Sequence, residues 1–292
     1  MIGKALKERA FFRCRRCLAG IVAISLLALQ GACAGGAGSA RAGLACEPGG
    51  GIPVLDYTLI RTLPHDPAAF TQGLLIADGW LYESTGLYGE SSVRRHELQS
   101  GRELARTALP AGLFGEGLVL AQGRLYQLTW QEGVVRSYRP EDLQLLASWR
   151  IDGEGWGLAF DGRHLIQSDG SATLFFRDPG DLREVRRLQV TAAGRPVRGL
   201  NELEYVGGRV FANLYPTDCV AVIDAAGGSV VGWLDLGGLA RRAAAEAPGT
   251  DVTNGIAYDP AAGSYYVTGK YWPFLAEIRI DGLSVRPAAD PR

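Results

Sequence analysis

Five copies of a short motif recur along the chain, and their spacing restricts the fold more than any other feature. Each copy is followed, after a turn that contains glycine, by a second apolar stretch. The copies are Phe70-Thr71-Gln72-Gly73-Leu74, Phe114-Gly115-Glu116-Gly117-Leu118, Gly155-Trp156-Gly157-Leu158, Leu200-Asn201-Glu202-Leu203 and Thr253-Asn254-Gly255-Ile256. Their central positions lie 44, 40, 45 and 53 residues apart. A period of roughly 40–50 residues built from short strands is typical of a β-propeller with one four-stranded blade per repeat.

The segments around the repeats complete this prediction. Residues 54–63 alternate as a strand, and we expect them to form the outer strand of the last blade, which closes the ring without an open edge. One helix is predicted over 236–247, where Leu, Ala, Arg and Glu dominate before Pro248-Gly249. The predicted fold class is therefore all-β, a five-bladed β-propeller over residues 53–292.

The first 34 residues have the composition of an export signal. Basic residues up to Arg16 precede an apolar run over 18–29, which is shorter than the ~20 residues of a membrane-spanning helix. Ala32-Cys33-Ala34 offers a small-x-small cleavage site. We therefore predict a signal peptide over 1–34, a flexible Gly- and Ala-rich arm over 35–52, and a periplasmic or secreted protein. The alternative is a lipoprotein anchored to a membrane at Cys33, which Gln30 at the third position before that cysteine disfavours.

The charge balance restricts the partners. Residues 1–34 hold six of the 30 Lys and Arg residues but one of the 31 Asp and Glu residues, so the remaining chain has a net charge near −6. This charge disfavours nucleic acid and an anionic membrane surface as partners. We expect the protein to act as a monomer.

The cysteines and histidines give two further expectations. Outside the predicted signal only Cys46 and Cys219 remain, and export permits a disulfide between them, the alternative being two separate buried thiols. The histidines are His65, His96 and His164. They lack metal-ligand spacing, so the sequence predicts neither a His-based zinc site nor any other metal or cofactor.

Superposed repeats place chemically active residues in two columns. The first column is Gln72, Glu116, Trp156, Asn201 and Asn254, and the second is Gly86, Trp130, Gly170, Tyr215 and Lys270. All five first-column residues are expected to start the innermost strands, so both columns should meet at one mouth of the central channel. Packing is the alternative role for the two asparagines and the aromatic residues. Glu116 lies between two glycines beside Phe114, a tight apolar setting that raises a carboxyl pKa towards the range useful for proton transfer.

Several motifs resemble the plant-type glutaminyl cyclases, whose bacterial members are exported five-bladed propellers. They are Phe-x-Gln-Gly from Phe70, Phe-Gly-Glu-Gly from Phe114, Leu-Thr-Trp ending at Trp130, Trp-Gly-Leu from Trp156, Leu-Asn-Glu-Leu-Glu from Leu200, Thr-Asn-Gly-Ile-Ala from Thr253 and Gly-Lys-x-Trp-Pro around Lys270. The resemblance runs from about residue 57 to residue 280. It implies conversion of N-terminal glutamine of peptides or proteins to pyroglutamate with release of ammonia.

The resemblance also implies roles for individual residues. Glu116 would shuttle the proton. The chemistry of ring closure independently makes Lys270 and Gln72 candidates for supporting the oxyanion or binding the substrate amide. The expected substrate-binding residues are Phe70, Phe114, Trp130, Trp156, Asn201 and Tyr215. The family usually has Trp where this chain has Tyr215. No acidic cluster makes a calcium site evident, and nothing in the sequence suggests the zinc that animal-type cyclases use on a different fold.

Two other functions remain open from the sequence. A non-catalytic propeller could bind an exposed peptide or sugar at the same mouth, since Trp and Tyr suit that task equally well. A propeller hydrolase such as a lactonase would instead need a clear set of metal ligands on the axis.

Overall fold

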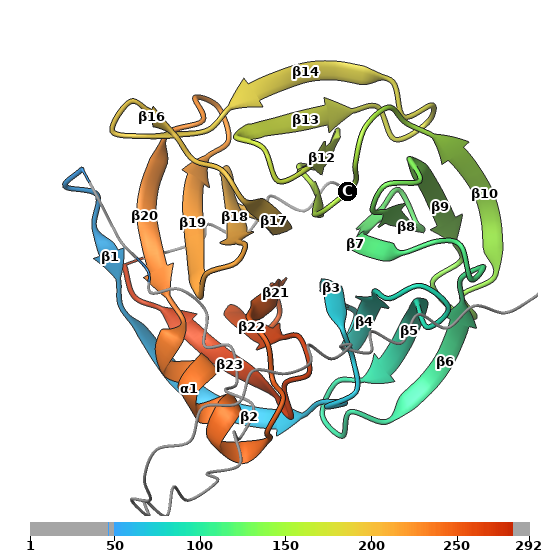
Figure 1. The fold of residues 1–292 in the computed structure, drawn as a ribbon, viewed down its shortest axis with the longest axis horizontal. Helices are drawn as coiled ribbons and strands as arrows, with labels where there is room; N and C mark the ends of the chain where they lie inside the picture. Colours follow the sequence, from blue (N-terminus) through green and yellow to red (C-terminus); the bar gives the residue numbers. More distant parts are fainter. Residues whose placement is uncertain (1–45, 47–49, 283–292) are drawn as a thin grey trace, which may run out of the picture. The chain divides into compact units, whose positions relative to one another are not determined.

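The computed structural model describes residue 46 and residues 50–282. Within that part of the chain, five sheets surround a central axis (Figure 1), which confirms the predicted five-bladed β-propeller. The first blade is β3 (Thr71–Ala77), β4 (Trp80–Thr85), β5 (Ser92–Glu97) and β6 (Glu103–Ala108), and the second is β7 (Gly115–Ala121), β8 (Arg124–Thr129), β9 (Val134–Tyr138) and β10 (Leu145–Arg150). The third is β11 (Leu158–Phe160), β12 (Leu165–Gln167), β13 (Thr173–Arg177) and β14 (Glu184–Gln189). The fourth contains β17 (Leu200–Val206), β18 (Arg209–Leu214), β19 (Cys219–Asp224) and β20 (Val230–Asp235), and the fifth contains β21 (Thr253–Asp259), β22 (Ser264–Gly269) and β23 (Phe274–Ile280).

The N-terminal segment closes the ring, but it contributes to two blades. β2 (Tyr57–Pro64) pairs antiparallel with β23 as the outer strand of the fifth blade, as predicted. β1 (Val54–Leu55) instead pairs parallel with β20 of the fourth blade, so the expected single strand over 54–63 is divided at Asp56. The segment therefore covers the edges of two neighbouring sheets (Figure 1).

Apolar side chains fill the space between neighbouring blades. Between the first and second blades, Tyr82 and Val93 pack against Leu118, Leu125 and Tyr138. Equivalent clusters lie at the other four interfaces within the described residues. Each such leucine contributes about 1.5–3 kcal/mol by leaving water, so the stability of each blade depends on its two neighbours.

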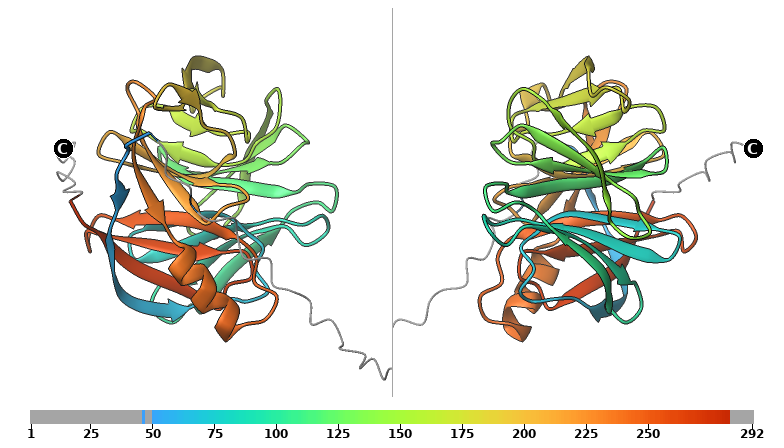
Figure 2. Two further views of the ribbon diagram at one scale, coloured as in Figure 1. Left: turned by 60° about the vertical axis from the view of Figure 1, so that its left-hand side comes forward. Right: turned by 90° about the vertical axis from the view of Figure 1, so that its right-hand side faces the viewer.

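The predicted helix is confirmed as α1 (Gly237–Glu246), which lies outside the ring beside β23 (Figure 2). Leu239 and Ala243 of α1 join the apolar cluster between the fourth and fifth blades. A short hairpin of β15 (Thr191–Ala192) and β16 (Arg195–Pro196) between the third and fourth blades was not predicted, because its strands are too short to show a pattern. Among the described residues, no helix is long and apolar enough to cross a membrane.

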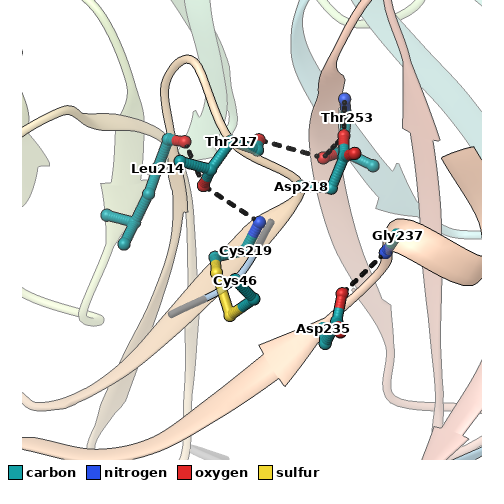
Figure 3. The surroundings of a disulfide bond; sticks show 8 residues. All are labelled: Cys46, Leu214, Thr217, Asp218, Cys219, Asp235, Gly237 and Thr253. Carbon is teal, nitrogen blue, oxygen red and sulfur yellow. Dashed lines mark hydrogen bonds between the residues drawn. A yellow bond between two sulfur atoms is a disulfide. The ribbon is translucent and has the colours of Figure 1, made fainter. Parts of the chain in front are cut away.

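The disulfide between Cys46 and Cys219 is present (Figure 3), which confirms that expectation. Its Cα atoms lie 5.1 Å apart, and it joins residue 46 to the start of β19 across 173 residues of sequence. Ile52 packs against the same apolar cluster as Cys46. The predicted signal peptide over 1–34, the possible anchor at Cys33 and much of the predicted arm lie outside the described residues.

Candidate active site

A cavity of about 260 Å³ lies at the N-terminal ends of the inner strands. All nine residues predicted for the site line it, together with Leu87. They are Phe70, Gln72, Phe114, Glu116, Trp130, Trp156, Asn201, Tyr215 and Lys270. The structure therefore brings together residues that are up to 200 positions apart in the sequence.

Local irregularities in the inner strands coincide with the polar members of the first column. The β3–β4 register shifts between Thr71 and Gly73, so Gln72 is the extra residue, and the β7–β8 register shifts in the same way around Glu116. The same break occurs at Asn201 in β17 and at Asn254 in β21. Such bulges re-aim a side chain out of the regular alternation, which here directs it to the channel.

The third blade departs from the prediction. Trp156 lies two residues before β11 and does not start the inner strand. Backbone pairing is nevertheless present there, because Trp156 N–H donates to the Ser168 carbonyl and Ser168 N–H donates to the Gly157 carbonyl, both at 3.0 Å. Gly157 N–H donates to the Ser168 hydroxyl at 2.7 Å, and the regular ladder of β11 begins at Leu158. Trp156 nevertheless lines the cavity with the other predicted residues.

The glycines beside Glu116 allow close contact between neighbouring inner strands. A Cβ atom on Gly115 would lie 2.6 Å from the carbonyl oxygen of Thr85, and one on Gly117 would lie 2.5 Å from the backbone nitrogen of Leu158. Any side chain at either position would push the strands apart. The Phe-Gly-Glu-Gly motif therefore holds Glu116 between three blades, with 4% of its surface exposed.

A chain of amide hydrogen bonds fixes the orientation of Glu116. Asn254 Nδ2 donates to the Thr71 carbonyl and to Gln72 Oε1, both at 2.9 Å. Because Gln72 Oε1 is occupied in this way, Gln72 Nε2 faces Glu116 and donates to its Oε1 at 2.9 Å. This arrangement leaves Glu116 Oε2 and the second N–H of Gln72 available to a bound molecule.

Burial governs the protonation of the two charged groups in the cavity. Desolvation raises the pKa of Glu116 well above its usual value, although the Lys270 ammonium opposes this shift. Desolvation also lowers the pKa of Lys270, against the opposing charges of Glu116 and Asp251. Both shifts favour the neutral forms of these groups, and a perturbed carboxyl in a cavity is a candidate for proton transfer.

Aromatic rings form the walls of the cavity. Lys270 Nζ lies 4.5 Å from the centroid of the Phe70 ring and 5.0 Å from that of Tyr215, so both rings make a cation–π contact with it. The second-column glycines provide room for other rings. A Cβ atom on Gly170 would lie 2.7 Å from the Trp156 ring, and one on Gly86 would clash with the Phe114 ring.

The sequence did not identify two carboxylates that hydrogen-bond to residues of the cavity wall. Glu154 Oε2 accepts hydrogen bonds from the indole nitrogens of Trp130 and Trp156, both at 2.9 Å. Glu132 accepts from the hydroxyl of Tyr88 at 2.7 Å and from the backbone nitrogen of Phe114 at 3.3 Å. Both carboxylates lie two positions from a cavity-lining Trp, but nothing in the sequence indicates that they reach into a neighbouring blade.

The amide oxygen of Asn201 is a hydrogen-bond acceptor that a bound molecule could use. It is 3% exposed, and among the described residues no donor is hydrogen-bonded to its Oδ1 atom. A buried unpaired amide oxygen is costly, and a ligand with an N–H group would relieve that cost. In the described part of the chain, no three His, Cys, Asp or Glu side chains are grouped as they would be around a metal ion.

The fold and the cavity together define a five-bladed β-propeller with one buried carboxyl and one buried ammonium in an aromatic pocket on its axis. The chain belongs to the glutamine cyclotransferase family, whose family model matches residues 27–280. It is 41% identical over 234 residues to the glutaminyl-peptide cyclotransferase of Arabidopsis thaliana, covering 79% of this chain and 73% of the plant protein. The crystal structure of Myxococcus xanthus glutaminyl cyclase matches with a TM-score of 0.74 and 38% identity, covering 80% of this chain and all of the other. These similarities confirm the resemblance that the motifs suggested.

Proposed function

We propose that the protein is a glutaminyl-peptide cyclotransferase that converts N-terminal glutamine of peptides to pyroglutamate, with Glu116 carrying the proton. The observation that carries this proposal is the buried, oriented carboxyl of Glu116 with one free oxygen in an aromatic cavity. The activities printed for the Arabidopsis and Myxococcus relatives support it. A non-catalytic peptide- or sugar-binding propeller has no comparable need for a carboxyl with a raised pKa.

The reaction needs one proton to move between two nitrogen atoms. The α-amine nitrogen of the substrate bonds to its side-chain carboxamide carbon, and the bond from that carbon to the carboxamide nitrogen breaks. The proton that the amine loses leaves with the carboxamide nitrogen as ammonia. Glu116 Oε2 would accept the proton during ring closure and return it to the departing nitrogen, acting first as base and then as acid.

The remaining polar groups suit the carboxamide and the oxyanion. Lys270 and the free N–H of Gln72 would stabilise the negative charge that develops on the carboxamide oxygen. Asn201 Oδ1 would accept a hydrogen bond from the carboxamide N–H₂ and thereby satisfy its own unpaired oxygen. Because ring closure is intramolecular, holding the substrate glutamine side chain bent towards its own α-amine supplies much of the acceleration.

The aromatic side chains that line the cavity would hold the substrate glutamine in this bent conformation. Four aromatic residues line the cavity with Glu116 and would enclose the aliphatic part of the glutamine: Phe70, Phe114, Trp130 and Trp156. Tyr215 is 41% exposed at the mouth, where the rest of a peptide would leave the cavity. We therefore expect Tyr215→Phe to have a mild effect, because it keeps the ring.

The test is ammonia release from a peptide with N-terminal glutamine, with and without EDTA. The matched control substrate is the same peptide with an acetylated N-terminus, whose amine cannot attack. Release from the free peptide alone, unaffected by EDTA, would support the proposal. Binding without release would favour the binding module, and EDTA-sensitive release would indicate a metal-dependent mechanism.

We also propose that the protein is exported and acts as a monomer outside the cytoplasm. The disulfide supports an oxidising compartment. Mass spectrometry of the mature N-terminus would identify cleavage after Ala34, whereas a diacylglyceryl group on Cys33 would establish the lipoprotein alternative. Sedimentation velocity would give the oligomeric state.

A further inference from the structure

We propose that Glu154 is a positioning residue, which holds the indole rings of Trp130 and Trp156 in place as two walls of the cavity. A single oxygen, Oε2, accepts both indole N–H groups at 2.9 Å. Trp130 follows β8 of the second blade, whereas Trp156 precedes β11 of the third. One carboxylate thus fixes the relative orientation of rings from two blades.

Glu154 is itself held in place from the side away from the cavity. The side chain of Gln167, which is 1% exposed, donates to the Glu154 carbonyl at 2.8 Å. Gln167 in turn accepts from the guanidinium of Arg177 at 2.5 Å. The other carboxylate oxygen of Glu154 accepts from Gln131 at 3.3 Å. Gln167 therefore holds the backbone of Glu154, and Gln131 adds a contact to its carboxylate.

The two indoles depend on this acceptor. An indole N–H is a donor only, and hydrogen bonds to an ionised acceptor are stronger than those to a neutral one. The two indole rings also pack against other residues that line the cavity, because Trp130 contacts Phe114 edge-on and Trp156 contacts Tyr215 edge-on. A rotation of either ring would therefore change the shape of the cavity beyond that ring.

The charge of Glu154 has a second, separable effect. It is one of the charges that raise the pKa of Glu116, together with Glu132, while Lys270 and the hydrogen bond from Gln72 lower it. Glu154→Gln keeps a carbonyl oxygen for the indoles and removes the charge. Glu154→Ala removes both, so the two variants separate positioning from electrostatics.

The experiment compares Glu154→Ala and Glu154→Gln with a matched control, Asp152→Asn. Asp152 is an exposed carboxylate in the same connection between blades, and neither indole donates to it. The first measurement is the ¹H–¹⁵N spectrum of the tryptophan indoles without substrate, with assignments from Trp130→Phe and Trp156→Phe. Glu154→Ala should move both indole resonances, whereas Asp152→Asn should leave them unchanged.

The second measurement is the kinetics of ammonia release as a function of pH, and it depends on the proposed cyclase function. Glu154→Ala should lower kcat/KM by ~10- to 10²-fold, the scale expected when reacting groups are misplaced by about 1 Å. Glu154→Gln should restore most of kcat/KM and move the acidic limb of the pH profile to lower pH. Asp152→Asn should change neither quantity.

Three results would overturn the proposal: unmoved indole resonances in Glu154→Ala, kcat/KM within twofold of wild type in that variant, or equal losses in the Ala and Gln variants. The third result would assign the effect to charge alone. An inactive wild-type protein would refute the cyclase function but not the positioning of the rings, since the indole spectrum is recorded without substrate.

Discussion

Replacement of Glu116 by Gln should abolish most of the activity while leaving the site assembled. The amide oxygen of the variant can still accept the hydrogen bond that Gln72 donates to Oε1 at 2.9 Å. The substitution therefore removes proton transfer and preserves positioning. Loss of general acid–base help costs ~10²–10⁴ in turnover, which corresponds to about 2.7–5.5 kcal/mol of transition-state stabilisation.

The same variant makes a prediction about stability. A carboxyl whose pKa is raised on folding stabilises the fold below its unfolded pKa of about 4.5, and that contribution is lost as the pH rises towards its folded pKa. Gln does not titrate. The melting temperature of the wild-type protein should therefore fall relative to that of Glu116→Gln as the pH is raised from about 4 to neutral. Differential scanning calorimetry across this range measures the difference.

Glu202 provides the matched control. Its carboxyl is also fully buried with a pKa well above the usual value because of desolvation. However, its oxygens accept from the backbone nitrogens of Leu74 at 3.3 Å and Ile256 at 2.8 Å, and it does not line the cavity. Glu202→Gln should lose stability, because its amide N–H₂ faces a backbone donor, and keep turnover per folded molecule. A well-folded Glu116→Gln protein with near wild-type turnover, or equal losses in both variants, would refute the reasoning.

Three further predictions concern other parts of the molecule. Lys270→Met should lower turnover by ~10²–10³ and move the acidic limb of the pH profile to higher pH, because the ammonium lowers the pKa of Glu116; an unchanged limb would contradict this. Reduction of the disulfide between Cys46 and Cys219 should lower the unfolding free energy by about 2–5 kcal/mol in denaturant titrations, and equal midpoints with and without reductant would contradict it. Burial alone would lower the pKa of His65, but the charge and hydrogen bond of Glu83 hold it above its usual 6.5. The ion pair therefore stabilises the fold fully below about pH 6.5 and less as the pH rises through the folded pKa, so wild-type melting temperatures should fall towards those of His65→Gln as the pH is raised above about 6.5.

The sequence by itself determined the architecture and which residues line the cavity. Five motifs at nearly constant spacing indicate five equivalent blades, and equivalence places corresponding residues at the same level of one axis. Glu116, Lys270 and the aromatic residues could therefore be grouped without knowledge of any distance. The helix could also be predicted from the sequence, because its composition differs from that of the strands around it.

The tertiary structure alone decided how those residues are held and how they titrate. Asn254 reaches Gln72 across 182 positions, and Glu154 links rings from two blades. The division of residues 54–63 between two sheets likewise depends on which strand edges remain open. Repetition predicts which positions are equivalent, but it does not predict contacts between blades whose sequences differ. The pKa of Glu116 follows from such contacts, because burial between three blades and the charges around it exist only in the closed ring.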